Sequence, residues 1–337
     1  MDSVTQALLG ASVGELCLGK KVGNKAALWG AIAGTIPDLD VFVARSFDVV
    51  RELEIHRGFS HSLVFSLLLA PILGWLVSTY QKKKRAGFFD WTKLFFWCLF
   101  THPLLDLFTT WGTQLLWPLE HRYALQSIFV IDPIYTLPLL IAIAIILFLP
   151  KSSKNRRKIN SAALLFSTAY LLLTLVNKQV INYKYKKSLQ NQQVAYIEFQ
   201  TRPAPFSTLM WAANVETADN FLLSYYSYFD AENSIEFYAL PKNHELLYPF
   251  RNDPRVEKLI EITNGYYTII PEGKNVLLND LRFGLTRGWD NASGDFVFQY
   301  RISKEPNGEV VIEKVELARE EGKRLLSSWW ERVKGKS

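Results

Sequence analysis

Histidine and carboxylate side chains are concentrated in the first third of the chain, beside or inside strongly apolar segments. Four of the five histidines, His56, His61, His102 and His121, fall within residues 1–121, and each has an acidic residue close by in sequence. Ionisable groups in apolar surroundings are costly unless they are paired, hydrated or bound to a ligand. Imidazole and carboxylate together are ligands that divalent metals such as zinc bind well. The pattern therefore predicts a metal site built into a membrane domain.

Two pairs of residues have the spacing of metal ligands. His102 and Asp106 are four residues apart, which puts both side chains on one face of a helix. Asp38 and Asp40 follow Pro37 at the end of an apolar stretch, where a turn lets two carboxylates converge on one or two metal ions. The alternatives are a histidine–aspartate hydrogen bond inside a helical bundle and a solvated loop with a capping aspartate.

The segment 56–61 carries two further histidines and a serine. Ser60 is the expected N-cap of the next helix, which would hold His61 in the first turn and leave His56 in the loop. Arg57 lies between the two histidines and suits bidentate binding of a phosphate. Glu120, beside His121, is a candidate general base, although a loop of this kind is more often solvent-exposed.

Asp2 is a possible ligand, a group that orients a ligand, or a helix N-cap. Together the candidates exceed what one metal binds, so the sequence predicts two or three ions, zinc or alternatively manganese, that share carboxylates. Such clusters generate a hydroxide and hold both the attacking and the leaving oxygen, which suits phosphoester hydrolysis. The seven candidate ligands are Asp2, Asp38, Asp40, His56, His61, His102 and Asp106.

The elements that must position these residues are apolar. Small residues four apart, Gly10 with Gly14 and Gly30 with Gly34, predict that the first two apolar stretches form a tightly packed hairpin. The third and fifth stretches are long enough to cross a bilayer, which takes ~20 residues, and the fourth and sixth are nearly so. The stretches lie at residues 4–18, 26–36, 61–80, 91–108, 133–149 and 161–177.

The net charge of +6 is explained by basic loops between membrane segments and does not indicate nucleic-acid binding. Much of it comes from basic clusters at 20–21, 82–85 and 151–158, all between apolar segments, where cytoplasmic loops carry lysine and arginine. With these loops in the cytoplasm, every candidate ligand lies at the outer face of the membrane. Targeting is expected from the helices themselves, since no cleavable signal peptide is apparent.

The character of the sequence changes after Lys178. Segments 194–200, 221–229, 234–240, 266–272, 296–303 and 309–317 alternate like strands, and 320–334 has the spacing of an amphipathic helix. We therefore expect a mainly α, polytopic membrane domain of about six apolar helices, the first two short, over residues 1–180. An α+β extracytoplasmic domain is expected over residues 185–337.

Four motifs together resemble a known family. They are Met1-Asp2-x-x-Thr5-x-x-x-x-Gly10, Gly34-x-x-Pro37-Asp38-x-Asp40, His56-Arg57-Gly58-x-Ser60-His61-Ser62 and His102-x-x-x-Asp106. In this order they are similar to the YdjM-like, LexA-regulated inner-membrane proteins described as metal-dependent hydrolases. The stretch from Arg202 to Trp211 is similar to the extracytoplasmic extension of some members.

The resemblance implies a multi-pass protein of a prokaryotic cytoplasmic (inner) membrane, with a helical multi-zinc core related to zinc phospholipase C and P1 nuclease. Many members have histidine where this chain has Gln6, so one coordination position differs. Gln6 lies one turn after Asp2, and we expect its amide to hydrogen-bond a ligand carboxylate or a bound water without coordinating.

These observations predict a membrane-embedded metal-dependent hydrolase of a phosphoester, in a lipid or polyprenyl-phosphate substrate at the outer face. The alternative is a non-catalytic membrane protein whose polar or metal cluster is structural or regulatory. A metal-transport protein would need a polar path through the bilayer, which the third, fifth and sixth apolar stretches do not supply.

Overall fold

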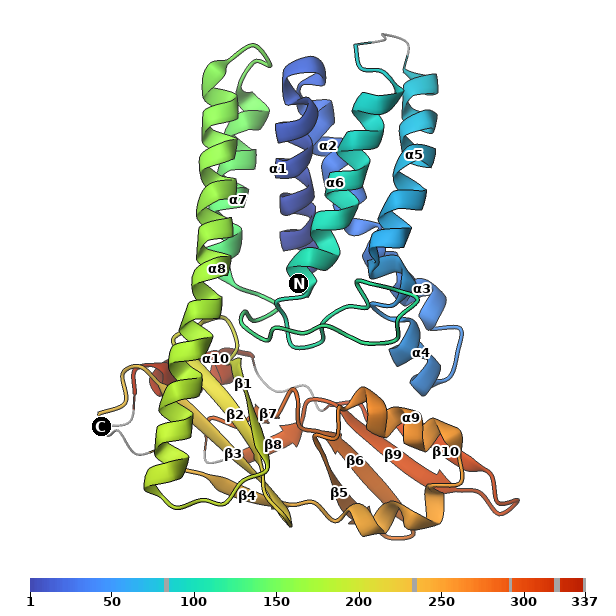
Figure 1. Cartoon of the computed structure of the whole chain (residues 1–337), viewed down its shortest axis with the longest axis vertical. Coiled ribbons are helices and arrows are strands. Elements are labelled where there is room, and N and C mark those ends of the chain that lie inside the picture. The colour runs from blue at the N-terminus through green and yellow to red at the C-terminus, as the bar shows by residue number, and fades with distance from the viewer. Residues whose placement is uncertain (82–84, 232–234, 291–292, 318–321, 336–337) are drawn as a thin grey trace. The chain divides into compact units, whose positions relative to one another are not determined.

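The computed structural model describes residues 1–81, 85–231, 235–290, 293–317 and 322–335. The chain forms two compact units. The first comprises Met1–Ser46, Glu54–Val176 and Pro205–Ser207, and the second comprises Phe47–Leu53, Asn177–Ala204 and Thr208–Ser337. The first unit is helical, and the second is rich in β-strands (Figure 1). This confirms the predicted order of a helical part followed by a part that contains sheets.

Each of the six apolar stretches forms a helix. Short elements occupy the connections that hold the candidate ligands: η1 (Pro37–Leu39), α3 (Asp40–Ala44), α4 (Val49–Ile55) and η2 (Phe59–His61). The six helices are α1 (Ser3–Val22), α2 (Asn24–Thr35), α5 (Leu63–Tyr80), α6 (Phe88–Asp106), α7 (Pro133–Phe148) and α8 (Lys154–Asn191).

The number of membrane-capable helices is smaller than six. Among the described residues, α5 and α8 are long and apolar enough to cross a membrane, and α2 with Pro37–Ala44, bent by 41°, adds a third if the pair is one span. The prediction for the fifth stretch was wrong, because α7 has only 16 residues. Polar and charged residues such as Gln6 and Glu15 in α1 and Asp90 and Lys93 in α6 lower the hydropathy of those two helices.

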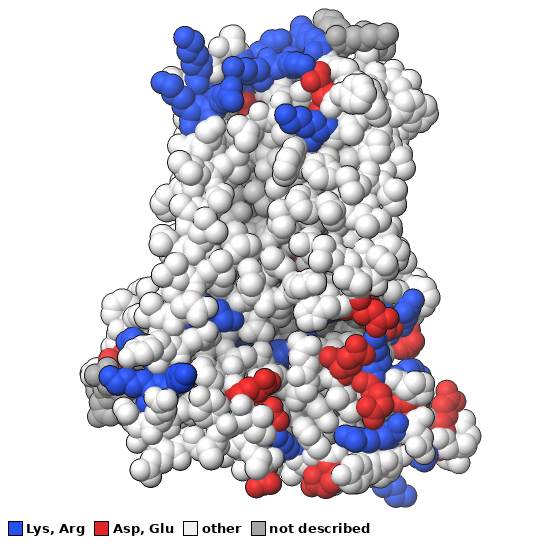
Figure 2. Space-filling view, viewed as in Figure 1, with Lys and Arg blue, Asp and Glu red and all other residues white. Residues whose placement is uncertain are grey.

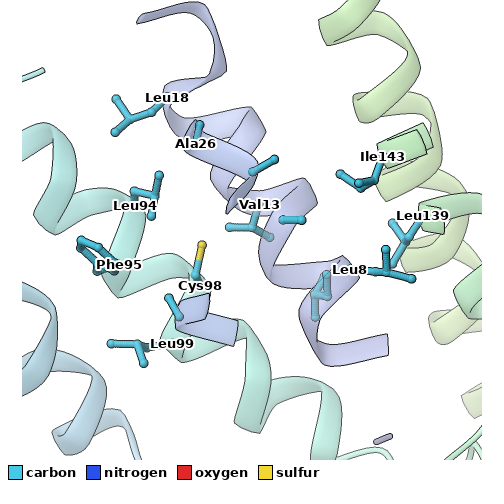
Figure 3. Close-up of a cluster of buried hydrophobic side chains, with 14 of the residues drawn as sticks. Leu8, Val13, Leu18, Ala26, Leu94, Phe95, Cys98, Leu99, Leu139 and Ile143 are labelled. Atoms are coloured by element: carbon cyan, nitrogen blue, oxygen red, sulfur yellow. The ribbon is translucent and has the colours of Figure 1, made fainter. Parts of the chain in front are cut away.

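The first two helices pack as the predicted hairpin. A Cβ at Gly10 would collide with the carbonyl oxygen of Gly30, and one at Gly14 would collide with that of Ala26, so both positions require glycine for the close approach. Apolar side chains of α1, α2, α6 and α7 meet in a common core (Figure 3). The core residues shown there include Leu8, Val13, Leu18, Ala26, Leu94, Phe95, Cys98, Leu99, Leu139 and Ile143.

Basic residues gather at one end of the helical unit (Figure 2). Exposed lysines and arginines of residues 20–25 and 151–158 contribute to this end, whereas residues 82–84 of the third basic cluster lie outside the described residues. The N-terminus, α3 and the loop between α6 and α7 lie at the other end of the same helices (Figure 1). The candidate ligands therefore share the end opposite to the basic loops.

The second unit contains antiparallel sheets. One has the order β1-β2-β3-β4, another the order β10-β9-β6-β5, and β7 pairs with β8. The helical elements are η3 (His244–Phe250), α9 (Pro254–Ile262) and α10 (Gly322–Val333), the last within the predicted amphipathic segment. The strands are β1 (Glu198–Pro203), β2 (Met210–Glu216), β3 (Asn220–Ser227), β4 (Tyr238–Pro241), β5 (Tyr267–Glu272), β6 (Asn275–Asp280), β7 (Leu285–Arg287), β8 (Ser293–Phe296), β9 (Gln299–Lys304) and β10 (Val310–Lys314).

Candidate metal centre

The ends of two helices position the histidines. His61 lies in η2, just before α5, and Ser62 caps α5 by accepting a hydrogen bond from the backbone N–H of Phe65 at 3.0 Å. The expectation that Ser60 is the cap was wrong, because the Ser60 hydroxyl donates to Asp40 Oδ2 at 2.8 Å instead. His102 lies in the last turn of α6, four residues before its end.

Four side chains from three segments converge at this end of the helices. Ligand atoms of Asp38, His61, His102 and Asp106 all lie within 4.8 Å of one another. The Nε2 atoms of the two histidines are 3.0 Å apart, and each lies 3.4 Å from Asp38 Oδ1 and 3.4 Å from Asp106 Oδ2. Three of the four side chains are fully buried, and that of Asp38 is 21% exposed.

The hydrogen bonds behind the histidines direct their Nε2 atoms at each other. His102 Nδ1 lies 2.6 Å from the carbonyl oxygen of Gly34, which only accepts, so Nδ1 carries a hydrogen and the neutral ring presents a lone pair at Nε2. His61 Nδ1 lies 2.9 Å from Ser60 Oγ and 3.4 Å from Asp40 Oδ2. This is the arrangement in which an outer carboxylate fixes the tautomer of a metal-binding histidine.

The centre requires a cation or a proton between its donors. Two Nε2 lone pairs that face each other at 3.0 Å repel, and two carboxylates add negative charge on either side. Asp106 Oδ2 is buried and has no hydrogen-bond partner among the described atoms. A buried polar atom without a partner is costly, and a metal ion would satisfy all four donors at once. The residues therefore fit a metal ion.

Two basic groups of the chain contact Asp106. Arg57 Nε lies 3.5 Å from Asp106 Oδ2, and the amino group of Met1 contacts Asp106 Oδ1. Burial opposes a charge on His61, but the nearby carboxylates of Asp106, Asp38 and Asp40 outweigh it and raise the pKa of His61 to about 9. Burial lowers the pKa of His56, which favours its neutral form.

Asp40 and His56 lie beside the group of four. Asp40 Oδ2 accepts hydrogen bonds from the backbone N–H of Arg57 at 2.9 Å and from Ser60 Oγ at 2.8 Å. Asp40 Oδ1 lies 3.2 Å from His56 Nδ1. Both oxygens of this carboxylate therefore hold the segment 56–61 in place, and the ring of His56 packs against those of His61 and Trp111.

The first helix supplies one group to the centre. Asp2 caps α1 by accepting hydrogen bonds from the N–H groups of Val4 and Thr5, and it lies outside the group of four. Gln6 Nε2 donates to Asp106 Oδ1 at 3.1 Å and to the carbonyl of His102 at 3.3 Å. This confirms the expectation that the Gln6 amide bonds a candidate ligand carboxylate.

The remaining candidates, Arg57, Glu120 and His121, do not belong to the group of four. Arg57 is buried with a positive φ of 58°, and its Nη1 donates to Thr109 Oγ1 at 2.9 Å. Glu120 and His121 are exposed in the loop between α6 and α7, outside the group of four. The ring of His121 packs on that of Tyr123, with centroids 4.6 Å apart.

Sequence reasoning missed three supporting groups. The carbonyl of Gly34 and the hydroxyl of Thr109 bond His102 and Arg57, and neither residue type signals such a role. Arg122 donates to the carbonyls of His56 at 2.9 Å and Glu54 at 2.8 Å, which fixes the loop before the histidines. Its position next to the candidate residues Glu120 and His121 was the available signal.

Residues 1–181 match the YdjM inner membrane protein family, and the match includes all four residues of the candidate metal centre. The chain belongs to this family. A similar curated protein is inner membrane protein YbcI of Escherichia coli (strain K12), 33% identical over 110 residues that cover 31% of this chain and 62% of that protein. The chain thus spans about three fifths of the length of that relative. No solved structure matches. Together with the apolar helices, the family supports a location in the inner membrane.

Proposed function

We propose that this protein is a membrane-embedded, metal-dependent phosphoester hydrolase that uses zinc. The observation that carries the proposal is the spacing of the four donors. Zinc bonds of about 2.0–2.1 Å in a tetrahedral site place the ligand atoms about 3.3–3.4 Å apart. Five of the six distances among the donor atoms of Asp38, His61, His102 and Asp106 are 3.0–3.4 Å, close to this spacing, and all six lie within 4.8 Å, which supports binding of one such ion.

The donor set includes a position at which a substrate can enter. Catalytic zinc sites combine three protein ligands with one open position. Asp38 is the exposed member, on the short η1, whereas His61, His102 and Asp106 are buried. We therefore assign the three buried residues as the permanent ligands and Asp38 as the one that yields its position to water or substrate.

Side chains of the protein then accept the proton of the attacking water and bind the phosphate. A bound zinc ion supplies Lewis acidity and activates water at neutral pH. The Asp38 carboxylate is next to the open position and accepts the proton of the attacking water, a role for which the exposed Glu120 is less well placed. The Arg57 guanidinium, whose buried Nε has no hydrogen-bond partner in the part of the chain that the structure describes, binds the phosphoryl oxygens and holds Asp106 in place.

The substrate we propose is a phosphoester of a membrane lipid or a polyprenyl phosphate at the outer face. Its support is the position of the centre at the helix ends opposite to the basic loops, because basic loops are retained in the cytoplasm. Cysteines placed at Lys154 and at Lys304, both exposed, test the orientation: we expect labelling from opposite sides of the membrane. Labelling of both from one side would contradict it.

Metal content and phosphatase activity test the function together. We expect the purified protein to hold zinc and to release phosphate from phosphatidic acid or a polyprenyl phosphate. His102→Ala should lose both properties, whereas His121→Ala, the matched control in an exposed loop, should retain both. Full metal retention in His102→Ala would overturn the assignment.

The four donors also favour a second function, a structural metal site. A tetrahedral zinc site closed by four protein ligands is the usual structural arrangement. Metal binding without hydrolysis of either substrate, together with loss of thermal stability on chelation, would support this non-catalytic function instead.

A further inference from the structure

The short helix α3 presents different chemistry on its two sides. Asp40 and Ala44 are buried, and Asp40 bonds the segment that carries His61. On the outer side Phe42 is 65% exposed and Val43 is 60% exposed, and Leu39, just before the helix, is also largely exposed. A five-residue helix that exposes this much apolar surface needs a partner, since large exposed apolar patches mark interaction sites.

A second apolar patch contacts the same segment 56–61. Phe59, between the candidate residues Arg57 and His61, is exposed, and its ring packs edge-on against Trp117 with centroids 4.8 Å apart. Leu116, Trp117 and Leu119 of the following loop are also exposed. The metal centre is thus bordered by exposed apolar groups from two parts of the helical unit.

These patches continue a surface that faces lipid. Phe59 also contacts Phe65 of α5 with ring centroids 5.4 Å apart, and α5 is one of the two helices that can span the membrane alone among the described residues. Its side chains Leu68, Ile72 and Trp75 are more than half exposed. In a protein of an inner-membrane family, such side chains face acyl chains.

A basic group borders the α3 patch. Arg45 is exposed, and its guanidinium lies 5.8 Å from the centroid of the Phe42 ring. Arginine at a membrane interface extends its charged head toward lipid phosphates while its stem covers apolar surface. Tryptophan rings such as that of Trp117 are also typical of this depth.

We propose that seven apolar residues, one from η1, two from α3, Phe59 and three from the loop 116–119, insert into the headgroup layer around the candidate metal centre. The surface comprises Leu39, Phe42, Val43, Phe59, Leu116, Trp117 and Leu119. Its occupant is the lipid of the leaflet itself. This extends the proposed function, on which its substrate part rests: the phosphoester reaches Arg57 and Asp38 from the membrane, as the headgroup of an embedded lipid, and a water-soluble phosphoester is a poor substrate.

Spin labels test the insertion without reference to metal or hydrolysis. Single cysteines replace Phe42 and Leu119 in the full chain, with Cys17 and Cys98 changed to alanine, in phosphatidylethanolamine–phosphatidylglycerol vesicles. Leu68→Cys is the lipid-facing control and Lys304→Cys the aqueous control. We expect labels at 42 and 119 to favour oxygen over a water-soluble nickel chelate, as the label at 68 does. Chelate access equal to that at 304 would overturn the proposal.

A charge substitution tests the substrate part. Phe42 and Val43 are exposed and do not belong to the four candidate ligands. The double variant Phe42→Asp with Val43→Asp should therefore contain as much metal as the unchanged protein. We expect hydrolysis of phosphatidic acid in vesicles to fall about tenfold and that of p-nitrophenyl phosphate to stay unchanged. Equal loss on both substrates contradicts lipid delivery. Absence of hydrolysis by the unchanged protein refutes the proposed function, while the spin-label result still decides the insertion.

Discussion

Replacing Asp40 by asparagine separates a metal ligand from a group that positions one. The carboxylate accepts from the backbone N–H of Arg57 and from Ser60 Oγ, and it faces His56 Nδ1 and His61 Nδ1. An amide has one accepting oxygen in place of two and no charge. The asparagine would therefore lose some of these contacts and hold the His61 ring less firmly. The four candidate metal ligands, Asp38, His61, His102 and Asp106, would all remain.

The expected effect is a loss of affinity without a loss of stoichiometry. Groups that orient metal-binding histidines contribute about 10–100-fold to affinity. This corresponds to about 1.4–2.7 kcal/mol for Asp40→Asn. Ser60→Ala removes the hydroxyl next to His61 Nδ1 but keeps the carboxylate, so its effect should be smaller. His61→Ala removes a metal ligand, so its loss of zinc affinity should be larger than that of either Asp40→Asn or Ser60→Ala.

Zinc titration against a competing chelator, with metal analysis of the saturated protein, measures affinity and stoichiometry separately. We expect Asp40→Asn to bind as many ions per chain as the unchanged protein, but more weakly. If Asp40→Asn instead loses an ion, Asp40 is a ligand and a second ion lies between it and His56. If its affinity is unchanged, the hydrogen bonds at Asp40 do not position His61.

Three further predictions follow from other contacts. Gln6→Leu removes the hydrogen bond to Asp106, so turnover should fall about tenfold with metal content retained; unchanged turnover would contradict the role of the amide. Arg156→Met leaves the buried Glu15 carboxylate unpaired, so it should destabilise by about 3–5 kcal/mol in thermal unfolding, and adding Glu15→Leu should recover part of this. Because the pKa of His61 is raised to about 9, metal must displace its proton, so apparent zinc affinity should rise about tenfold per pH unit between pH 6 and 8; a flat profile would refute this.

The local part of the metal centre could be predicted from the sequence. The four-residue spacing of His102 and Asp106 needs only helical geometry, and the structure places both on α6. The proximity of His102 and Asp106 to Asp38 and His61 depends on how α2, α5 and α6 pack, and no local sequence pattern specifies this packing. The prediction of Ser60 as the cap of α5 was wrong for the same reason: Ser60 donates its hydroxyl hydrogen to Asp40, which a local pattern does not reveal, and Ser62 has the extended backbone of the cap.

The errors in the fold have local physical causes. β2 (Met210–Glu216) was not predicted because its first six residues are all buried, so the polar–apolar alternation that marks a half-exposed strand is absent. α7 ends at Phe148 because Leu149 precedes Pro150, and a residue before proline disfavours the helical conformation. The apolar composition of 133–149 indicated a span, but its 16-residue helix is shorter than ~20 residues.

Either a metal ion or a proton can bind among the same four donors, so the two interpretations of the cluster, a metal site and a hydrogen-bond network, apply to one position. Because the Gly34 carbonyl directs the hydrogen of His102 to Nδ1, the two Nε2 atoms, 3.0 Å apart, can share one positive group: a proton between them, or a metal ion beside them and next to the two carboxylates. In the absence of metal we expect this group to be a proton on His61, because the surrounding carboxylates stabilise the charged ring and raise the pKa of His61. The same carboxylates attract a divalent ion more strongly, since it carries twice the charge and also satisfies Asp106 Oδ2. The arrangement that favours the proton therefore favours a metal ion as well, and under the proposed function we expect pH to determine which of them occupies the centre.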